Sequence, residues 1–320
     1  MPEPNDRDGM KSVSCTRGEL LAEASRALRV EGRENSVAPE NARTDAIRLV
    51  AAALDIPPHS LLVSPETPEG EAACERVQGF IARRLRHEPV SRIIGSRAFW
   101  KNDFIVTPAT LDPRADSETV VALAGDIIER EGLNDRPFTL LDLGTGTGCL
   151  AISLLMDYPT ASAIAVDIDP DALAAASLNS DQAGVADRFT ARQSDWTDRV
   201  SEHVDLVISN PPYIPSADIA DLAEDVRNYD PHQALDGGAD GLDAYRMIAR
   251  AAARVAGGGW LVLECGQDQA DAVDTIMQRA GHRTAINGRR QDLAGIERAL
   301  AYRITKASPL QSRSPAGEHA

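Results

Sequence analysis

The 320-residue sequence predicts an α/β fold, in which a doubly wound parallel sheet follows a small helical domain. Two observations carry this prediction. From Pro137 onward, short apolar runs alternate with stretches of helical spacing, and repeated strand–helix units of this kind form parallel sheets. Between residues 16 and 90, apolar residues recur only at helical spacing, and clusters of Gly, Pro and Asn separate the stretches.

Three apolar stripes predict the helices of the first domain, because each stripe lies on one helical face. The stripes are Leu20, Leu21, Ala24, Ala27 and Leu28; Ala46, Ile47, Val50, Ala51 and Leu54; and Val77, Phe80, Ile81 and Leu85. After them, Ile93–Gly95 and Phe104–Val106 have the composition of short strands, with a turn near Lys101–Asp103. We therefore predict a β-hairpin between the two domains.

Five apolar runs predict strands of the sheet: Phe138–Leu143, Ala161–Val166, Val204–Ser209, Trp260–Glu264 and Glu297–Ile304. A helical stretch, Cys149–Met156, follows the first run, and Asp169 with Pro170 supplies an N-cap and a first-turn proline for the next helix. The predicted organisation is a disordered leader (1–15), a helical domain (16–90), a hairpin linker (91–115), an α/β domain (116–306) and a disordered tail (307–320). Both ends are rich in Pro, Ser, Gly and charge.

The charge and the apolar runs of the chain argue against several classes of function. The chain has 33 Lys and Arg against 49 Asp and Glu, a net charge of -16, which repels phosphate backbones and argues against direct nucleic-acid binding. The densest basic stretch, Arg83–His87, fits either a solvated helix face or a contact for an acidic partner. No apolar run is long enough for a membrane span, and Met1 to Lys11 lacks a secretory segment, so we expect a cytoplasmic protein.

The four cysteines, Cys15, Cys74, Cys149 and Cys265, form no C-x-x-C pair and no metal-ligand spacing. We interpret them as reduced thiols and predict no metal site.

A glycine loop follows the first predicted strand of the sheet. It reads Gly144, Thr145, Gly146, Thr147, Gly148, after Asp142 and Leu143. Alternate glycines let the backbone turn sharply from strand to helix and let a ligand approach the main chain. A nicotinamide fingerprint needs G-x-G-x-x-G, but position 149 is Cys, so the G-x-G-x-G pattern suits S-adenosylmethionine better.

Asp167 ends the second predicted strand of the sheet. A carboxylate there can accept hydrogen bonds from both ribose hydroxyls of a nucleoside. The alternative is a helix cap, but Asp169 is better placed for that role. Loop and acid together predict an adenosine site.

Asn210, Pro211, Pro212 and Tyr213 follow the third predicted strand. A strand-ending turn would explain the prolines, but the chemical interpretation uses all four residues. The Asn210 side-chain carbonyl and the Pro211 backbone carbonyl can each accept one proton of a planar NH2 group, while Tyr213 packs on its flat face. This arrangement predicts methylation of an amino or amide nitrogen.

From about residue 16 to 304, the chain resembles the protein glutamine methyltransferase family of the HemK/PrmC type. The resemblance rests on five further stretches in the family's order: Val106–Arg114, Ala115–Glu118, Gln193–Trp196, Ala234–Gly238 and Asp292–Arg298. It implies a helical N-terminal domain, a hairpin linker and a Rossmann-like S-adenosylmethionine-dependent methyltransferase domain. Ala115 stands where the family usually has proline, a change that removes no proposed ligand.

Site roles follow from the resemblance. Gly144 to Gly148 and Asp167 would bind the cofactor, with Trp196 near the adenine, and Asn210 would contact both cofactor and substrate. Asn210 to Tyr213 would hold a glutamine amide. The helical domain would bind the protein substrate, because residues 16–90 hold no glycine loop or strand-end acid.

The expected substrate is a peptide chain release factor, methylated on the glutamine of its Gly-Gly-Gln loop. Release-factor enzymes keep an acid, a hydroxyl residue and a Glu after Pro-Arg, which match Asp116, Ser117 and Glu118, and a later Ser-Asp-Trp, which matches Ser194–Trp196. A ribosomal-protein methyltransferase, a nucleic-acid amino methyltransferase and a non-catalytic binding module stay open as alternatives.

Overall fold

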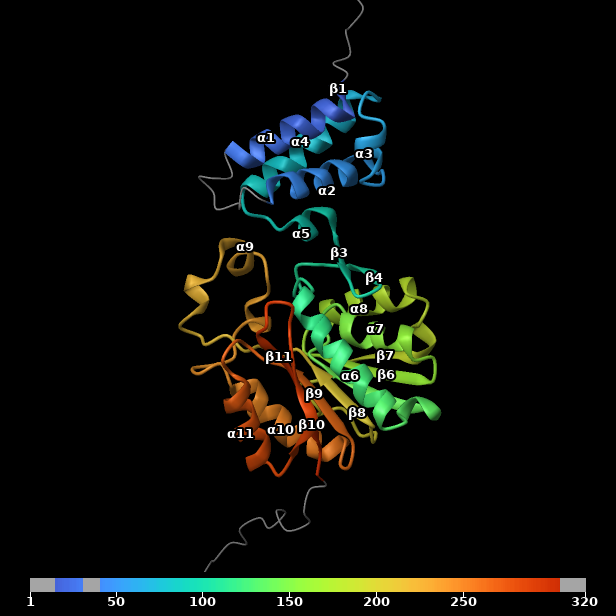
Figure 1. Cartoon of the computed structure of the whole chain (residues 1–320), viewed down its shortest axis with the longest axis vertical. Coiled ribbons are helices and arrows are strands. Elements are labelled where there is room, and N and C mark those ends of the chain that lie inside the picture. Colours follow the sequence, from blue (N-terminus) through green and yellow to red (C-terminus); the bar gives the residue numbers. More distant parts are fainter. Residues whose placement is uncertain (1–14, 31–40, 306–320) are drawn as a thin grey trace, which may run out of the picture. The chain divides into compact units, whose positions relative to one another are not determined.

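The computed structural model describes residues 15–30 and 41–305, and the chain divides into two compact units between Gly95 and Ser96 (Figure 1). The predicted tail, and all of the predicted leader except Cys15, lie outside the described residues. Within the described ranges, no helix combines the length and the apolar character that a membrane crossing requires.

The first unit is helical, as the three apolar stripes predicted. Its main helices are α1 (Arg17–Val30), α2 (Ala42–Leu54) and α4 (Glu71–Leu85); α3 (Ser60–Val63) and α5 (Val90–Ile94) are short. Leu28, Leu49 and Val50 are completely buried in a core that belongs to this unit alone. Two short strands, β1 (Cys15–Thr16) and β2 (Pro68–Glu69), pair antiparallel beside the helices.

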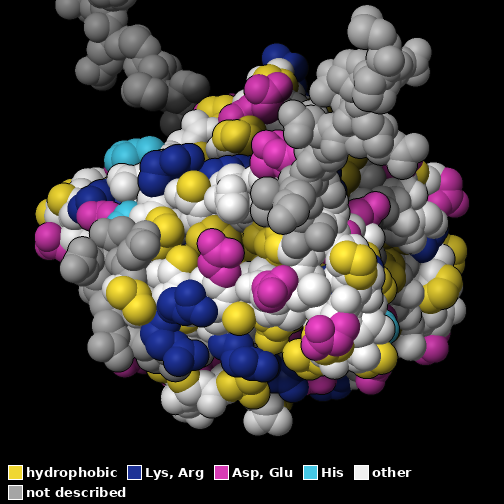
Figure 2. All heavy atoms as spheres, turned by 90° about the horizontal axis from the view of Figure 1, so that it is seen from above, with side chains coloured by type: hydrophobic (Ala, Val, Ile, Leu, Met, Phe, Trp, Pro, Cys, Tyr) yellow, Lys and Arg dark blue, Asp and Glu magenta, His cyan; other side chains and the backbone are white. Residues whose placement is uncertain are grey.

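The basic stretch of α4 forms ion pairs inside the helical unit. Arg83 Nε donates to Glu88 at 2.8 Å, and Arg84 Nε donates to Asp45 of α2 at 2.9 Å. These contacts favour a structural role for the stretch over a contact with an acidic partner. On the face that Figure 2 displays, several Lys and Arg side chains adjoin one another, others lie apart from them, and Asp and Glu side chains are scattered.

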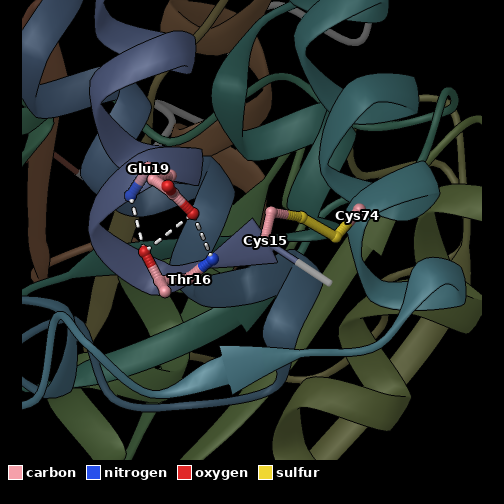
Figure 3. The surroundings of a disulfide bond; sticks show 4 residues. All are labelled: Cys15, Thr16, Glu19 and Cys74. Carbon is pink, nitrogen blue, oxygen red and sulfur yellow. Dashed lines mark hydrogen bonds between the residues drawn. A yellow bond between two sulfur atoms is a disulfide. The ribbon is translucent and has the colours of Figure 1, made fainter. Parts of the chain in front are cut away.

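The cysteines differ from the sequence-based expectation. Cys15 of β1 and Cys74 of α4 form a disulfide across 59 residues of chain (Figure 3). Cys149 and Cys265 are free. The spacing along the sequence could not reveal the pair, because only the packing of β1 beside α4 brings the two residues together. At the same strand, Thr16 and Glu19 exchange hydrogen bonds that cap α1.

The hairpin exists but is displaced from its predicted position. Ile93 and Ile94 lie in α5, not in a strand, and Gly95 ends that helix at φ 83°. A short apolar run cannot by itself distinguish a strand from a buried helical turn. The hairpin strands are β3 (Ser96–Phe99) and β4 (Asn102–Ile105), which belong to the second unit.

The hairpin is fixed to the second unit by the tryptophan at its turn. The Trp100 backbone N–H donates to Glu118 Oε1 at 2.7 Å, and the indole N–H donates to Asp157 Oδ2 at 2.8 Å. Phe99 and Phe104 are buried in the core of the same unit.

The second unit contains a seven-stranded sheet with the order β10-β11-β9-β8-β5-β6-β7. Its strands are β5 (Phe138–Leu143), β6 (Ala161–Asp167), β7 (Phe189–Gln193), β8 (Leu206–Ser209), β9 (Trp260–Glu264), β10 (Arg283–Gln291) and β11 (Glu297–Arg303). The sequence predicted five of them, but missed β7 and β10, whose residues are largely polar.

The sheet is mixed, which corrects the expectation of a wholly parallel one. β5 to β9 pair in parallel, but β11 runs antiparallel to both β9 and β10. Only Asp292–Ile296 connect β10 to β11, and so short a connection permits an antiparallel hairpin but no crossover.

Helices cover both faces of the sheet (Figure 1). On one side lie α6 (Glu118–Arg130), α7 (Cys149–Asp157) and α8 (Pro170–Gln182); on the other lie α10 (Asp243–Val255) and α11 (Ala270–Arg279). Leu140 and Leu141 of β5 enter opposite cores, as alternate strand residues must. The predicted N-cap of α8 is confirmed, since Asp169 accepts from the Asp171 N–H at 2.8 Å.

Strand order places the predicted site residues side by side. β5 lies between β6 and β8, and Leu143 is opposite both Val166 and Ser209. The residues that follow these three strand ends are therefore neighbours at one edge of the sheet. Because the chain builds outward from β5 in both directions, this edge is the switch point where open α/β sheets bind ligands.

Candidate active site

A cavity of about 290 Å³ opens at this edge of the second unit. Its lining contains most of the residues that the sequence singled out: Gly144, Thr145, Gly146, Thr147, Asp167, Trp196, Asn210 and Pro212. Gly148, Pro211 and Tyr213 do not line it. The structure thus brings most of the predicted cofactor loop and two of the four predicted clamp residues, Asn210 and Pro212, to one cavity.

The glycine loop uses left-handed backbone conformations at its alternate positions. Gly146 has φ 54°, and a Cβ built on it would meet no atom within 4 Å, so its backbone faces open space. Gly148 differs: at φ 79°, its Cβ would lie 2.8 Å from Ile152 Cδ1. Gly146 therefore permits close approach of a ligand, whereas Gly148 permits close packing where α7 begins.

The buried carboxyl group of Asp142 is hydrogen-bonded to the glycine loop. Thr145 Oγ1 donates to Asp142 Oδ2 at 2.7 Å, and Asp142 is 1% exposed. Burial raises the pKa of Asp142 to about 7, against the hydrogen bond from Thr145, which lowers it.

Asp167 faces the cavity at the end of β6 and also braces the loop. Its Oδ2 accepts the Gly146 N–H at 2.9 Å, and its Oδ1 accepts the Asp169 N–H at 3.1 Å. Burial raises the pKa of this carboxyl, while the hydrogen bond from Gly146 opposes the shift. The side chain is half-buried, so its remaining acceptor positions are open to a ligand.

Trp196 lines the cavity in an unusual backbone conformation, with φ 45°. Such a φ value is rare for a bulky residue, and it persists only where the surrounding structure holds the backbone in place. The segment is held next to β6, because the Ser194 N–H donates to the Asp167 carbonyl at 2.9 Å. Trp196 also packs against the core beneath the sheet.

Asn210 enters the cavity from the end of β8. Its Nδ2 donates to Ser117 Oγ at 3.0 Å, and Ser117 belongs to a 3₁₀ turn, η2 (Ala115–Ser117). This turn forms although Ala115 stands where the family usually has proline. Ser117 and Arg114, the residue that directly precedes η2, also line the cavity, and neither was predicted as a site residue.

Tyr213 lies behind the cavity. Its hydroxyl donates to Glu264 Oε1 at 3.2 Å, and its backbone carbonyl accepts Gln269 Nε2 at 2.9 Å. Burial is the main cause that raises the pKa of Tyr213, and it also raises the pKa of Glu264 to about 7. A direct contact between Tyr213 and a substrate stays a prediction.

Two other stretches that carry the family resemblance, Ala234–Gly238 and Asp292–Arg298, contact segments that flank the site. Gly237 N–H donates to the Ile214 carbonyl at 2.8 Å, which fixes the chain just after Tyr213. Arg298 lies 3.2 Å from Asp292 and 3.7 Å from Asp116 of η2.

Sequence reasoning missed Asp142, Ser117 and Glu264 as parts of this site. Asp142 could have been found as the polar residue within an apolar strand. Glu264 carried the same signal, because it is the polar last residue of the apolar run Trp260–Glu264. Ser117 stood out only as the hydroxyl residue after Pro-Arg in the family resemblance, because its partner Asn210 is distant in the chain.

Two family models match the chain. Residues 19–95 match the PrmC N-terminal domain, and residues 130–226 match the Methyltransferase small domain. The catalytic domain of human METTL16 in complex with a 3′UTR hairpin is similar in fold, with a TM-score of 0.50, 13% identity and coverage of 76% of this chain and 87% of that one. At that identity the likeness shows the fold alone.

Curated relatives cover nearly the whole chain. The release factor glutamine methyltransferase of Cereibacter sphaeroides is 43% identical over 84% of this chain and 93% of its own length. That of Rhodospirillum rubrum is 41% identical over 92% of this chain and 86% of its own. With these matches and an intact cavity at the switch point of the sheet, the chain belongs to the release factor glutamine methyltransferase family of enzymes.

Proposed function

We propose that this protein transfers a methyl group from S-adenosylmethionine to the side-chain amide nitrogen of the glutamine in the Gly-Gly-Gln motif of peptide chain release factors. The observation that carries the proposal is the position of Asn210, which enters the same cavity as the glycine loop and Asp167. A nucleoside-binding half and an amide-binding half thereby adjoin.

The residues present fit the cofactor. Gly144 and Gly146 leave open space where side chains would project, and Asp167 presents a carboxylate that suits ribose hydroxyls. Trp196 offers an apolar surface for the adenine. When bound, S-adenosylmethionine supplies a methyl group that is already activated on a sulfonium.

The clamp residues fit a planar amide. The NH2 group of Asn210 is taken by Ser117, so Asn210 Oδ1 is left to accept a proton from a substrate NH2. The proposed second acceptor is the backbone carbonyl of Pro211, in the rigid Pro211-Pro212 segment, although only Pro212 of this pair lines the cavity. Two acceptors would hold the nitrogen with its lone pair directed at the methyl donor, and no general base is needed before attack.

The names of the curated relatives support a release factor as the substrate. Release factors act where proteins are synthesised, so the proposed compartment is the cytoplasm. The helical unit, which has its own core and matches the PrmC N-terminal domain, is proposed to bind the protein substrate.

A competition assay tests the proposal. The enzyme would be given purified release factor, ribosomal protein and adenine-containing DNA together, with labelled cofactor. We expect mass spectrometry to find one added methyl group on the Gly-Gly-Gln glutamine alone. Label on the ribosomal protein or the DNA, with none on the release factor, would overturn the substrate while leaving the amino-group chemistry intact.

A further inference from the structure

A buried asparagine of α8, Asn179, joins the glycine loop to the end of the hairpin strand β4. It is 1% exposed and lies one helical turn after Ala176, which is the residue of α8 beside Gly148. Its Nδ2 donates to the Thr147 carbonyl at 2.9 Å and to the Ile105 carbonyl at 3.1 Å. Its Oδ1 accepts the Ile105 N–H at 2.7 Å.

These partners fix the orientation of the Asn179 carboxamide. The Ile105 N–H requires an oxygen, so Oδ1 faces it, and the NH2 group must face the two carbonyl groups. The opposite orientation would place the NH2 group against an N–H and the oxygen against two carbonyl oxygens. A buried amide whose two N–H donors and oxygen are all hydrogen-bonded holds its partners in one arrangement.

The first partner is the glycine loop. The peptide group between Thr147 and Gly148 is held at both ends: its carbonyl accepts from Asn179, and its N–H donates to the Thr145 carbonyl at 2.8 Å. Because a peptide group is planar, these two hydrogen bonds fix its direction. Thr145 and Thr147 both line the cavity, so Asn179 fixes the backbone where the cofactor is proposed to bind.

The second partner, Ile105, is the last residue of β4. The segment after it, residues 106–114, also contributes to the cavity lining, through Ala109, Leu111, Pro113 and Arg114. Arg97 Nε donates to the Pro113 carbonyl at 3.1 Å, so the far end of this segment has its own contact. The near end is held to α8 by the two hydrogen bonds between Ile105 and Asn179.

We propose that Asn179 is a positioning residue for methyl transfer, which keeps the glycine loop and residues 106–114 at the spacing that cofactor and substrate require. The inference rests on the proposed function, since it concerns a cofactor at the glycine loop. Asn179 does not line the cavity, so it acts through Thr147 and Ile105 and not by contact with a ligand. A shift of about 1 Å caused far from the reacting atoms can cost about 100-fold in rate.

Two substitutions at Asn179 test this role. Asn179→Asp is nearly isosteric, but a carboxylate cannot donate, so the Thr147 and Ile105 carbonyl groups lose their donor and face an oxygen. Asn179→Leu has a similar volume and removes all the hydrogen bonds of the side chain, whatever the charge of a carboxyl group would be.

The matched control is Arg188→Met. Arg188, in the 3₁₀ turn η4 (Ala186–Arg188), also donates to backbone carbonyl groups of other elements, at 2.8–3.2 Å. Its acceptors belong to residues that do not line the cavity: Leu155, Tyr158 and Ala161. The control therefore loses comparable hydrogen bonds without a change at the glycine loop.

Calorimetry with S-adenosylhomocysteine and single-turnover transfer to the release factor are measured well below the melting temperature of each variant. We expect both Asn179 variants to bind S-adenosylhomocysteine about tenfold more weakly and to transfer the methyl group about 100-fold more slowly at saturating cofactor. Arg188→Met should lower the melting temperature but leave affinity and rate unchanged. A role in stability alone would change neither affinity nor rate in the folded Asn179 variants.

Hydrogen exchange in the wild type tests the same connection without any variant. S-adenosylhomocysteine at about ten times its dissociation constant should slow exchange of the Ile105 amide by about tenfold, because opening of this contact would release the glycine loop. The matched amide is that of Trp100 in the same hairpin, which donates to Glu118 Oε1 at 2.7 Å. Glu118 does not line the cavity, so the Trp100 amide should change little.

Normal affinity and rate in both Asn179 variants would overturn the inference. So would an equal loss in Arg188→Met, or equal slowing of the Ile105 and Trp100 amides, because the effect would then reflect general stabilisation. If neither Asn179 variant folds, exchange in the wild type decides. Failure of the wild type to bind S-adenosylhomocysteine contradicts the proposed function and this inference with it, whereas binding and methylation by the wild type with any of the results above contradict the inference only.

Discussion

Two carboxyl groups, Asp142 and Glu264, lie almost completely buried next to the cavity, and burial raises the pKa of each to about 7. Their surroundings differ. Asp142 has one hydroxyl donor, Thr145, and no nearby cation is among the main influences on its pKa. Glu264 has Tyr213, Ser117 and the charge of Arg298 to support its ionised form. The ionised form of Asp142 therefore has less support from its surroundings than that of Glu264.

Asp142 should make the protein less stable as the pH rises. The unfolded chain ionises this carboxyl near pH 4, whereas the folded protein holds its proton up to a pKa of about 7. The folded state therefore binds more protons between these values, and stability falls as pH rises through that window. Asp142→Asn keeps an acceptor for Thr145 and cannot ionise.

Thermal melting of the two proteins from pH 4 to 8 measures this effect. The melting temperature of Asp142→Asn relative to the wild type should climb between pH 4 and 7 and then level off. A difference that does not vary with pH would show that Asp142 is already ionised in the folded protein.

Substitutions at Asp167 and Asn210 should have opposite consequences, because the two residues serve different halves of the cavity. Asp167→Ala removes the proposed ribose acceptor and a brace of the loop, so cofactor affinity should fall about 10- to 100-fold. Asn210→Ala should keep cofactor binding and lower turnover by about 10²- to 10³-fold. Calorimetry with the cofactor and single-turnover assays distinguish the two. A folded Asn210→Ala enzyme with normal turnover would refute the amide clamp.

At the scale of elements, the junction between β5 and α7 depends on a glycine with two separate requirements. Gly148 has a positive φ, and its Cβ position is occupied by Ile152 Cδ1 at 2.8 Å and Ala176 Cβ at 3.3 Å. Ile152 is completely buried and has little room to move. Gly184, at φ 70°, has the same backbone requirement but nothing within 4 Å of its Cβ position.

Gly148→Ala should therefore destabilise the protein more than Gly184→Ala does. The backbone cost in each case is about 1–2 kcal/mol, and overpacking adds about 1–3 kcal/mol at position 148 alone. Chemical denaturation of both variants measures the difference. Equal losses would indicate that the core around α7 adjusts to the extra methyl group.

At the scale of the whole molecule, the chain has two units with separate cores. The core of the first unit runs from Leu20 to Ile93, and every residue of the other two core clusters comes after Ser96. All lining residues of the active-site cavity belong to the second unit. Truncation can therefore test the proposed division of roles, with the cofactor bound by the second unit and the protein substrate by the first.

Deletion of residues 1–95 should abolish methylation of the release factor while cofactor binding persists. The remaining chain keeps the sheet, both of its covering layers and the whole cavity lining. Cofactor titration is the folding control, and transfer to the release factor is the readout. Full activity of the truncated protein would exclude the helical unit from substrate binding.

Local sequence signals were sufficient for many of the elements and indicated several residues that line the candidate cavity. Apolar runs located β5 and β9 at their observed bounds, and Asp169 with Pro170 marked the start of α8. The glycine loop, Asp167 and Asn210 were predicted because each lies at or directly after a strand end, where the residue types of a short segment indicate its chemistry. Short apolar segments failed, as Ile93 and Ile94 show, since strand and helix compete equally there.

Tertiary structure alone decided which distant residues meet. Asn210 and Ser117 are 93 residues apart, and Tyr213 and Glu264 are 51 apart, yet each pair is hydrogen-bonded. The antiparallel β11 and the Cys15–Cys74 disulfide likewise depend on which elements become neighbours. Periodicity and turn chemistry act over a few residues, whereas strand order and helix packing are set by burial of the whole chain. The sequence by itself therefore determined the elements and the chemistry at their ends, and the assembled fold decided the partners that orient that chemistry.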